Sequence, residues 1–228
     1  MANYAYLSLW FADGSRAGLI GHAEKLLRLF PISEYEPGFR AFLIRGVNAA
    51  ESPLFERDLL FSAEEVRSCL EEFFQADCAA ELRAYWDLWI YQPDGTRLDW
   101  QQRASPVEFA LHGESYDEAT FAENGHVLIT LGLEHLFTGH AGILSGSGAE
   151  TKPEQFTTRP EYEFALALQE PEVLEAYRTH TLENIRHLLA FERALWTGLP
   201  IARRWLWSEG ESDLEQRLEE VLLHCASQ

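Results

Sequence analysis

The chain has 228 residues, of which 46% are hydrophobic and 24% charged, a balance that suits a folded domain with a sizeable core and argues against global disorder. Its 37 acidic and 18 basic residues give a formal charge of -19, which argues against nucleic acid and anionic membranes as targets because phosphates are repelled. The three cysteines show no CxxC spacing, so neither a disulfide framework nor a cysteine-rich zinc site is expected.

The first half of the chain predicts alternating strands and helices. In order we expect strand, helix, strand, strand, helix and strand, at residues 4–11, 19–30, 39–44, 54–61, 62–74 and 82–91. Ser15 is the expected N-cap of the first helix, and Pro31 ends its apolar pattern. Ser62 and Glu65 have the spacing of a capping box at the start of the second helix. This order is that of a ferredoxin-like, split β-α-β unit.

Residues 82–100 begin with a segment, 82–91, whose side chains alternate strictly between two faces. The sequence Pro93-Asp94-Gly95 follows and favours a turn, so a hairpin that returns through Trp100 is predicted. One face, which includes Trp86, is apolar and is expected to lie in the core. The other face carries Tyr85, Trp89 and Tyr91, which either lie beneath another element or bind a partner. These three residues are our candidate binding residues.

The second half begins with two further predicted strands, at residues 107–112 and 126–133, and a short helix within residues 114–124. Residues 138–158 are rich in glycine, serine and threonine and predict a loop or linker. From Pro160 the pattern becomes helical, with the longest helix expected between Pro171 and Gly198. Residues 201–207 form a short segment with aromatic residues, and a last helix is expected at 214–225.

The predicted fold class is therefore α+β, with a mixed, mainly antiparallel sheet of ferredoxin-like character and a C-terminal helical layer or lobe. We expect a sheet domain at residues 1–137, a flexible loop or linker at 138–158, and a helical region at 159–228 that packs on the sheet. One compact domain overall is the alternative.

Two groups of polar residues are candidates for chemistry. Glu134, His135 and His140 lie where a predicted strand passes into a loop, and a His-carboxylate pair there is suited to general acid-base catalysis. His180, Glu183 and His187 can share one face of a helix and form a candidate metal site. The alternatives are solvated histidines at a turn and an ordinary polar helix face, and no cofactor is expected.

No catalytic signature occurs in the chain, which favours a non-enzymatic protein that binds a basic partner, for example as an inhibitor or immunity-like protein. A small-molecule enzyme, such as a hydrolase, is the alternative. The first ten residues lack the basic segment of a secretory signal, and charges interrupt every apolar run before the ~18–20 residues of a membrane helix. We therefore expect a cytoplasmic location.

Overall fold

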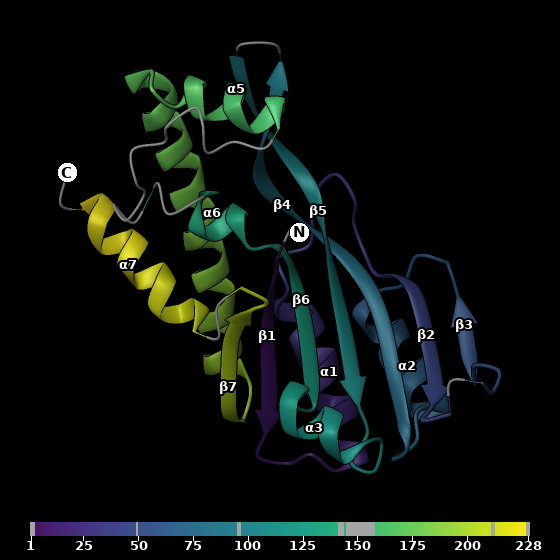
Figure 1. Cartoon of the computed structure of the whole chain (residues 1–228). Coiled ribbons are helices and arrows are strands. Elements are labelled where there is room, and N and C mark those ends of the chain that lie inside the picture. Colours follow the sequence, from purple (N-terminus) through teal and green to yellow (C-terminus); the bar gives the residue numbers. More distant parts are fainter. Residues whose placement is uncertain are drawn as a thin grey trace.

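The computed structural model describes residues 3–48, 50–94, 97–140, 144, 158–210 and 213–226. The fold is α+β, as predicted (Figure 1). The described residues form seven strands, β1 (Tyr4–Phe11), β2 (Arg40–Gly46), β3 (Phe55–Arg57), β4 (Cys78–Asp94), β5 (Arg97–His112), β6 (Val127–Leu133) and β7 (Ile201–Ser208). The helices are α1 (Arg16–Leu29), α2 (Ala63–Phe73), α3 (Glu118–Asn124), α4 (His135–Thr138), α5 (Arg159–Ala167), α6 (Pro171–Gly198) and α7 (Leu214–Ala226).

The described strands form one sheet in the order β3-β2-β4-β5-β6-β1-β7, and every neighbouring pair is antiparallel. The longest ladder joins β4 to β5, from Ala79 opposite His112 to Asp94 opposite Arg97, so the predicted hairpin extends further than expected. The ferredoxin-like unit predicted for residues 4–91 is not confirmed. Strand β1 pairs with β6 and β7, and three strands, β4, β5 and β6, lie between β1 and β2.

The C-terminal region contributes a strand as well as helices. Residues 201–207, expected within a helical region, belong to β7, which pairs with β1 from Ala5 opposite Ser208 to Phe11 opposite Ile201. The alternation of Arg203, Trp205 and Trp207 on one face is the period-two signal of this strand. Most of the predicted loop at 138–158 lies outside the described residues, and the expected domain boundaries stay a prediction.

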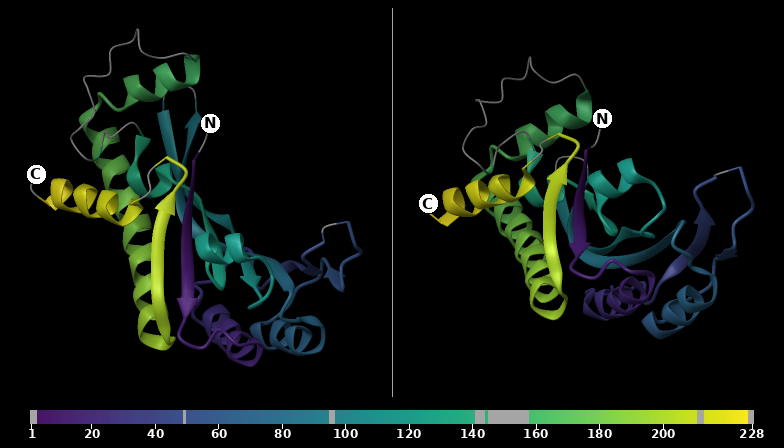
Figure 2. Two further views of the ribbon diagram at one scale, coloured as in Figure 1. Left: turned by 60° about the horizontal axis from the view of Figure 1, so that its bottom comes forward. Right: turned by 90° about the horizontal axis from the view of Figure 1, so that it is seen from below.

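Helices α2, α1 and α6 lie side by side against one face of the sheet (Figure 2). The predicted caps are confirmed: the Ser15 hydroxyl accepts a hydrogen bond from the Gly18 N–H, and Ser62 and Glu65 make both bonds of the capping box. These side chains satisfy backbone amides that a helix start leaves without partners. Within the described part of the chain, no helix is long and apolar enough to cross a membrane.

The core lies between this helical layer and the sheet. Trp86 is fully buried, as predicted, and its ring packs against Phe30, Phe137 and Phe191. Replacing such a ring by alanine typically costs about 3–5 kcal/mol, so this face of β4 is structural.

Candidate functional site

The far half of the β4–β5 hairpin depends on a side chain of α6. Strand β2 pairs with β4 only as far as Arg83, and no other strand of the described residues continues along that β4 edge. Here the Asn184 side chain accepts a hydrogen bond from the Trp89 N–H (2.9 Å) and donates to the Trp89 carbonyl (2.9 Å). It also donates to the Leu136 carbonyl (3.0 Å). Since Asn184 is 3% exposed, these bonds form away from water and fix α6 to the hairpin.

Because α6 passes this edge, its two halves contact opposite faces of β4. Before Asn184, the His180 ring lies 3.9 Å from the Trp89 ring, measured between centroids. After Asn184, the His187 ring lies 5.5 Å from the Trp86 ring. Trp89 is therefore half-buried beneath α6, which is the covered alternative that the sequence left open.

The other two candidate binding residues lie in different surroundings. Tyr91 is half-buried and stacks on Phe164 of α5, with centroids 4.8 Å apart. Tyr85 lies on the face of β4 opposite the helical layer, where it interacts with Arg83. The three residues predicted to bind a partner thus do not form one exposed surface, although none of the contacts tests that prediction directly.

The structure brings two of the three predicted catalytic residues together. The rings of His135 and His140 stack with centroids 4.2 Å apart, and His140 Nε2 lies 2.6 Å from the Tyr91 hydroxyl. The His140 backbone N–H donates to the Tyr177 hydroxyl at 2.8 Å. We call Tyr91, His135, His140 and Tyr177 the histidine-tyrosine cluster. The Glu134 carboxylate makes no described hydrogen bond with either histidine and points towards Gly210.

Burial keeps three members of this cluster, Tyr91, His135 and Tyr177, uncharged near neutral pH. It raises the pKa of Tyr91 to about 12 and raises the pKa of Tyr177 as well. Burial, and to a smaller extent the neighbouring His140, lowers the pKa of His135 to about 4. The phenols therefore stay protonated and His135 stays neutral near pH 7.

The predicted metal ligands are not brought into one site. His180 Nδ1 lies 3.5 Å from a carboxylate oxygen of Glu183, whereas the His187 ring contacts Trp86. Among the described residues, no group of three or more His, Cys, Asp or Glu side chains is arranged to hold a metal ion.

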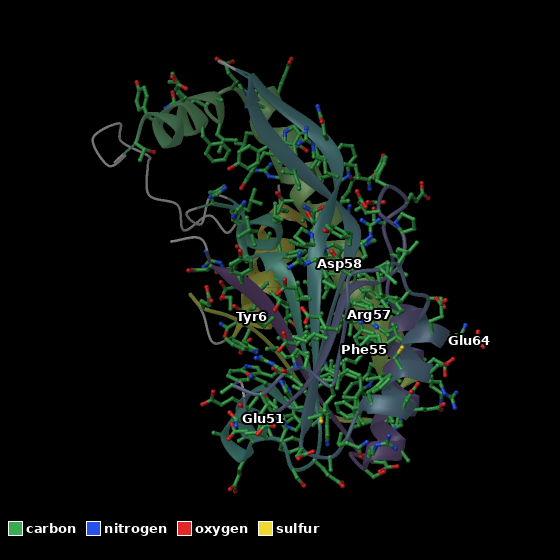
Figure 3. The ribbon with its side chains drawn as sticks, turned by 90° about the vertical axis from the view of Figure 1, so that its right-hand side faces the viewer. Tyr6, Glu51, Phe55, Arg57, Asp58 and Glu64 are labelled. Atoms are coloured by element: carbon green, nitrogen blue, oxygen red, sulfur yellow. The ribbon has the colours of Figure 1, made fainter. Side chains whose placement is uncertain are left out.

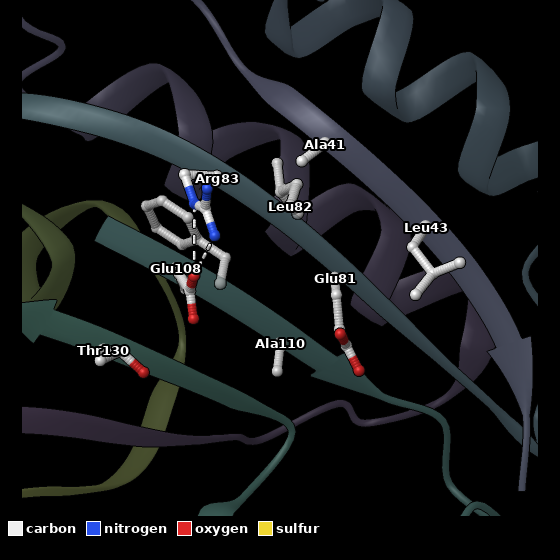
Figure 4. Close-up of a pocket in the computed structure, with 9 residues that line it drawn as sticks. Ala41, Leu43, Glu81, Leu82, Arg83, Glu108, Ala110 and Thr130 are labelled. Atoms are coloured by element: carbon white, nitrogen blue, oxygen red, sulfur yellow. Dashed lines mark hydrogen bonds and ion pairs between the residues drawn. The ribbon is translucent and has the colours of Figure 1, made fainter. Parts of the chain in front are cut away.

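The sheet face opposite the helical layer holds a shallow pocket of about 260 Å³ above β2, β4 and β5 (Figure 4). Two ion pairs lie in or beside it, Arg83 with Glu108 and Arg45 with Glu81, each with a closest N–O distance of 2.6 Å. Because every charge in these pairs is compensated, this pocket attracts neither cations nor anions strongly.

Further along the same face, aromatic rings of β1 and β7 form a stack. Tyr6 and Trp207 lie 4.4 Å apart, and Trp207 and Trp205 lie 5.3 Å apart, between ring centroids. The Trp207 indole N–H donates to the Ser8 hydroxyl at 3.1 Å. These rings are half-buried by one another, so they reinforce the pairing of β1 with β7.

Four exposed apolar side chains lie in the segments on either side of β3, at the opposite edge of the sheet; Phe55 and Arg57 of β3 are labelled in Figure 3. Val47 and Leu54 (each 51% exposed) lie before β3, and Leu59 (62%) and Leu60 (57%) follow it. We call these four residues the β3 margin. The exposed carboxylates of this segment are those of Glu51, Glu56 and Asp58. The sequence pattern does not indicate this surface, since it predicts a strand at residues 54–61, which include Leu54, Leu59 and Leu60.

No protein-family model, no curated protein and no solved structure matches this chain. Its function therefore has to be inferred from geometry and physical chemistry alone.

Proposed function

We propose that this protein is a non-enzymatic binding protein that holds a basic protein partner at the β3 margin. The supporting observation is that exposed apolar side chains are concentrated in one short segment of the chain. Of the ten large hydrophobic residues exposed in the described part of the chain, four lie within residues 47–60. Grouped apolar exposure of this kind, next to charged residues, is typical of a protein-binding surface, whereas single exposed apolar residues need no explanation.

Charge supports a basic partner. The chain carries a formal charge of -19, and Glu51, Glu56 and Asp58 lie within the same segment as the exposed aliphatic residues. Such a surface attracts a positively charged protein over a distance of about 8–10 Å in physiological salt. It also repels a second copy of the same chain. Neutralisation of a basic toxin by an inhibitor or immunity-like protein is one version of this function.

The binding element is the side-chain surface rather than the β3 backbone. Strand β3 has three residues and presents the charged side chains of Glu56 and Arg57. Short, charged edge strands are how proteins discourage the addition of another strand. The apolar residues on either side of β3 are therefore the contacts that we expect to contribute affinity.

The hydrolase alternative is less well supported. The carboxylate predicted to act with His135 and His140 is that of Glu134, and it is directed towards Gly210. We therefore favour binding over catalysis, in the cytoplasmic setting that the sequence predicts.

The test compares two aspartate variants in cross-linking and affinity capture under matched conditions. Leu59→Asp combined with Leu60→Asp places charge in the β3 margin, and Leu223→Asp places it on α7, where Leu223 is 72% exposed. A specific partner should be captured by the wild type and by Leu223→Asp but lost from the double variant. Its association should slow as salt rises, because screening weakens the attraction between opposite charges.

Equal capture by both variants, or association that is insensitive to salt, would contradict the proposal. A self-associating chain whose dimer is broken by the double variant would also contradict it. Sedimentation of the purified protein distinguishes that outcome.

A further inference from the structure

A second pocket, of about 270 Å³, lies between the segment that follows α1 and the edge of β4, and it is independent of the β3 margin. It is lined by Pro31, Ile32, Glu34, Tyr35, Asp87, Gln102 and His187. We propose that this pocket binds a primary ammonium or guanidinium group, carried either by a small amine or by a lysine or arginine side chain. Its volume lies just below the ~300–1,000 Å³ range of pockets for whole small molecules, which suits a head group on a short chain.

Asp87 is held in place by neutral donors. Its carboxylate accepts hydrogen bonds from the Ser33 hydroxyl and from the Glu34 backbone N–H, the latter at 2.9 Å. The Ser33 hydroxyl oxygen in turn accepts from the backbone N–H groups of Tyr35 and Glu36, each at 3.0 Å. These bonds orient the carboxylate without neutralising it, and no described basic side chain forms an ion pair with Asp87.

His187 supplies a hydrogen-bonding atom without a partner. Its Nε2 atom is shielded from solvent and makes no hydrogen bond in the structure. Burial lowers the pKa of His187, although the nearby Asp87 carboxylate opposes this effect, so the imidazole is neutral at pH 7. The neutral imidazole therefore adds no positive charge to the pocket that it lines.

The lining selects a cation that donates hydrogen bonds. Among the described residues, the lining contains two carboxylates, those of Glu34 and Asp87, and no lysine or arginine, so an anion is repelled. Gln102 and Tyr35 line the same pocket; an amide oxygen can accept a hydrogen bond and an aromatic ring can face a cation. An ammonium group offers three donors and a guanidinium offers five, which match these acceptors.

The binding test uses the full chain with butylammonium and butylguanidinium chloride as probes, followed by calorimetry and by the NMR signals of the His187 ring. We expect saturable binding of both probes in the millimolar range, about -4 kcal/mol. Butyrate, which carries the opposite charge, and butyltrimethylammonium, which has no N–H donor, should bind at least tenfold more weakly.

Two variants with a matched control locate the binding site. Glu34→Gln should weaken butylammonium binding about threefold, and Asp87→Asn about tenfold, because each removes one charge from the pocket. Glu36→Gln is the control, since Glu36 belongs to the same segment but pairs with Arg40 and does not line the pocket. Asp87→Asn can also disturb the segment after α1, because the Asp87 carboxylate bonds to it. Glu34→Gln still tests the site by itself, because the Glu34 side chain makes no described hydrogen bond.

Equal weakening by Glu34→Gln and Glu36→Gln, or equal binding of butyltrimethylammonium, would overturn the proposal. A peptide with a single lysine distinguishes the source of the cation: tighter binding than butylammonium indicates a protein side chain, and equal binding indicates a small amine. The Leu59→Asp, Leu60→Asp variant should bind butylammonium like the wild type, so failure of the pocket and failure of the β3 margin are separable.

Discussion

The histidine-tyrosine cluster and the β3 margin dispose their side chains in opposite ways. In the cluster, the aromatic and imidazole rings pack against one another and against α5, and Tyr91 and His135 are uncharged near neutral pH. At the β3 margin, aliphatic side chains with no chemistry of their own are exposed to water. In this molecule the aromatic side chains of the cluster therefore pack inside the fold, whereas the apolar side chains that are exposed to water at the β3 margin are aliphatic.

The largest expected change in the free energy of unfolding comes from detaching α6, which covers the cluster, from the β4–β5 hairpin. Asn184→Leu leaves the Trp89 N–H and carbonyl and the Leu136 carbonyl without their buried partner. Each such loss costs about 1–3 kcal/mol, so the free energy of unfolding should fall by roughly 3–5 kcal/mol in urea denaturation. Asn48→Leu, at an exposed turn, is the control and should cost less than about 1 kcal/mol. A similar cost for both variants would show that the cluster is not held by this amide.

The second prediction concerns acid. The pKa of His135 falls from 6.5 to about 4 on folding, so the folded state favours the neutral imidazole. The stability that this residue contributes is complete above pH 6.5 and is lost as the pH falls towards 4, a change of about 3 kcal/mol. Denaturation of His135→Phe at several pH values should show a shallower loss than the wild type. An identical pH dependence would mean that His135 is not buried in the folded protein.

A smaller effect is expected from the hydroxyl that joins the hairpin to the cluster. Tyr91→Phe keeps the ring stack on Phe164 but removes the hydrogen bond to His140 Nε2. The free energy of unfolding should fall by about 1 kcal/mol. Tyr35→Phe, at a ring that is 64% exposed and makes no described hydrogen bond, should be neutral within about 0.5 kcal/mol.

The smallest effect is expected at the β3 margin. Leu59→Asp alone should change the free energy of unfolding by no more than about 0.5 kcal/mol, because the side chain is already in water. Leu70→Ala, on the buried face of α2, should cost about 2–5 kcal/mol. If Leu59→Asp destabilised the protein as much, the margin would be part of the core and not a surface.

The parts of the fold that were predictable depend on residues close together in sequence. The Ser62–Glu65 capping box and the alternating face of Trp86 are local patterns, and both are confirmed. The placement of β7 beside β1 could not be predicted, because it joins residues such as Ala5 and Ser208 across nearly the whole chain.

The candidate site shows the same limit. His135 and His140 were identified as a group, but their hydroxyl partner Tyr91 is 49 residues from His140 along the chain, and no periodicity relates them. The sequence also could not predict that His180 and His187 contact different tryptophans of β4. Their spacing predicts a shared helix face, and only the position of β4 beside Asn184 places them on different sides.

The Asn184 amide also bears on solubility. Beyond β2, the β4 edge is met by the Ser33 backbone N–H at the Tyr85 carbonyl and by Asn184 at Trp89. A strand edge with open donors and acceptors is a template on which another chain can polymerise. At Trp89 the Asn184 side chain thereby makes the two hydrogen bonds that a neighbouring strand would make. The β4–β5 hairpin can then extend from the sheet without offering these backbone groups to another copy of the chain.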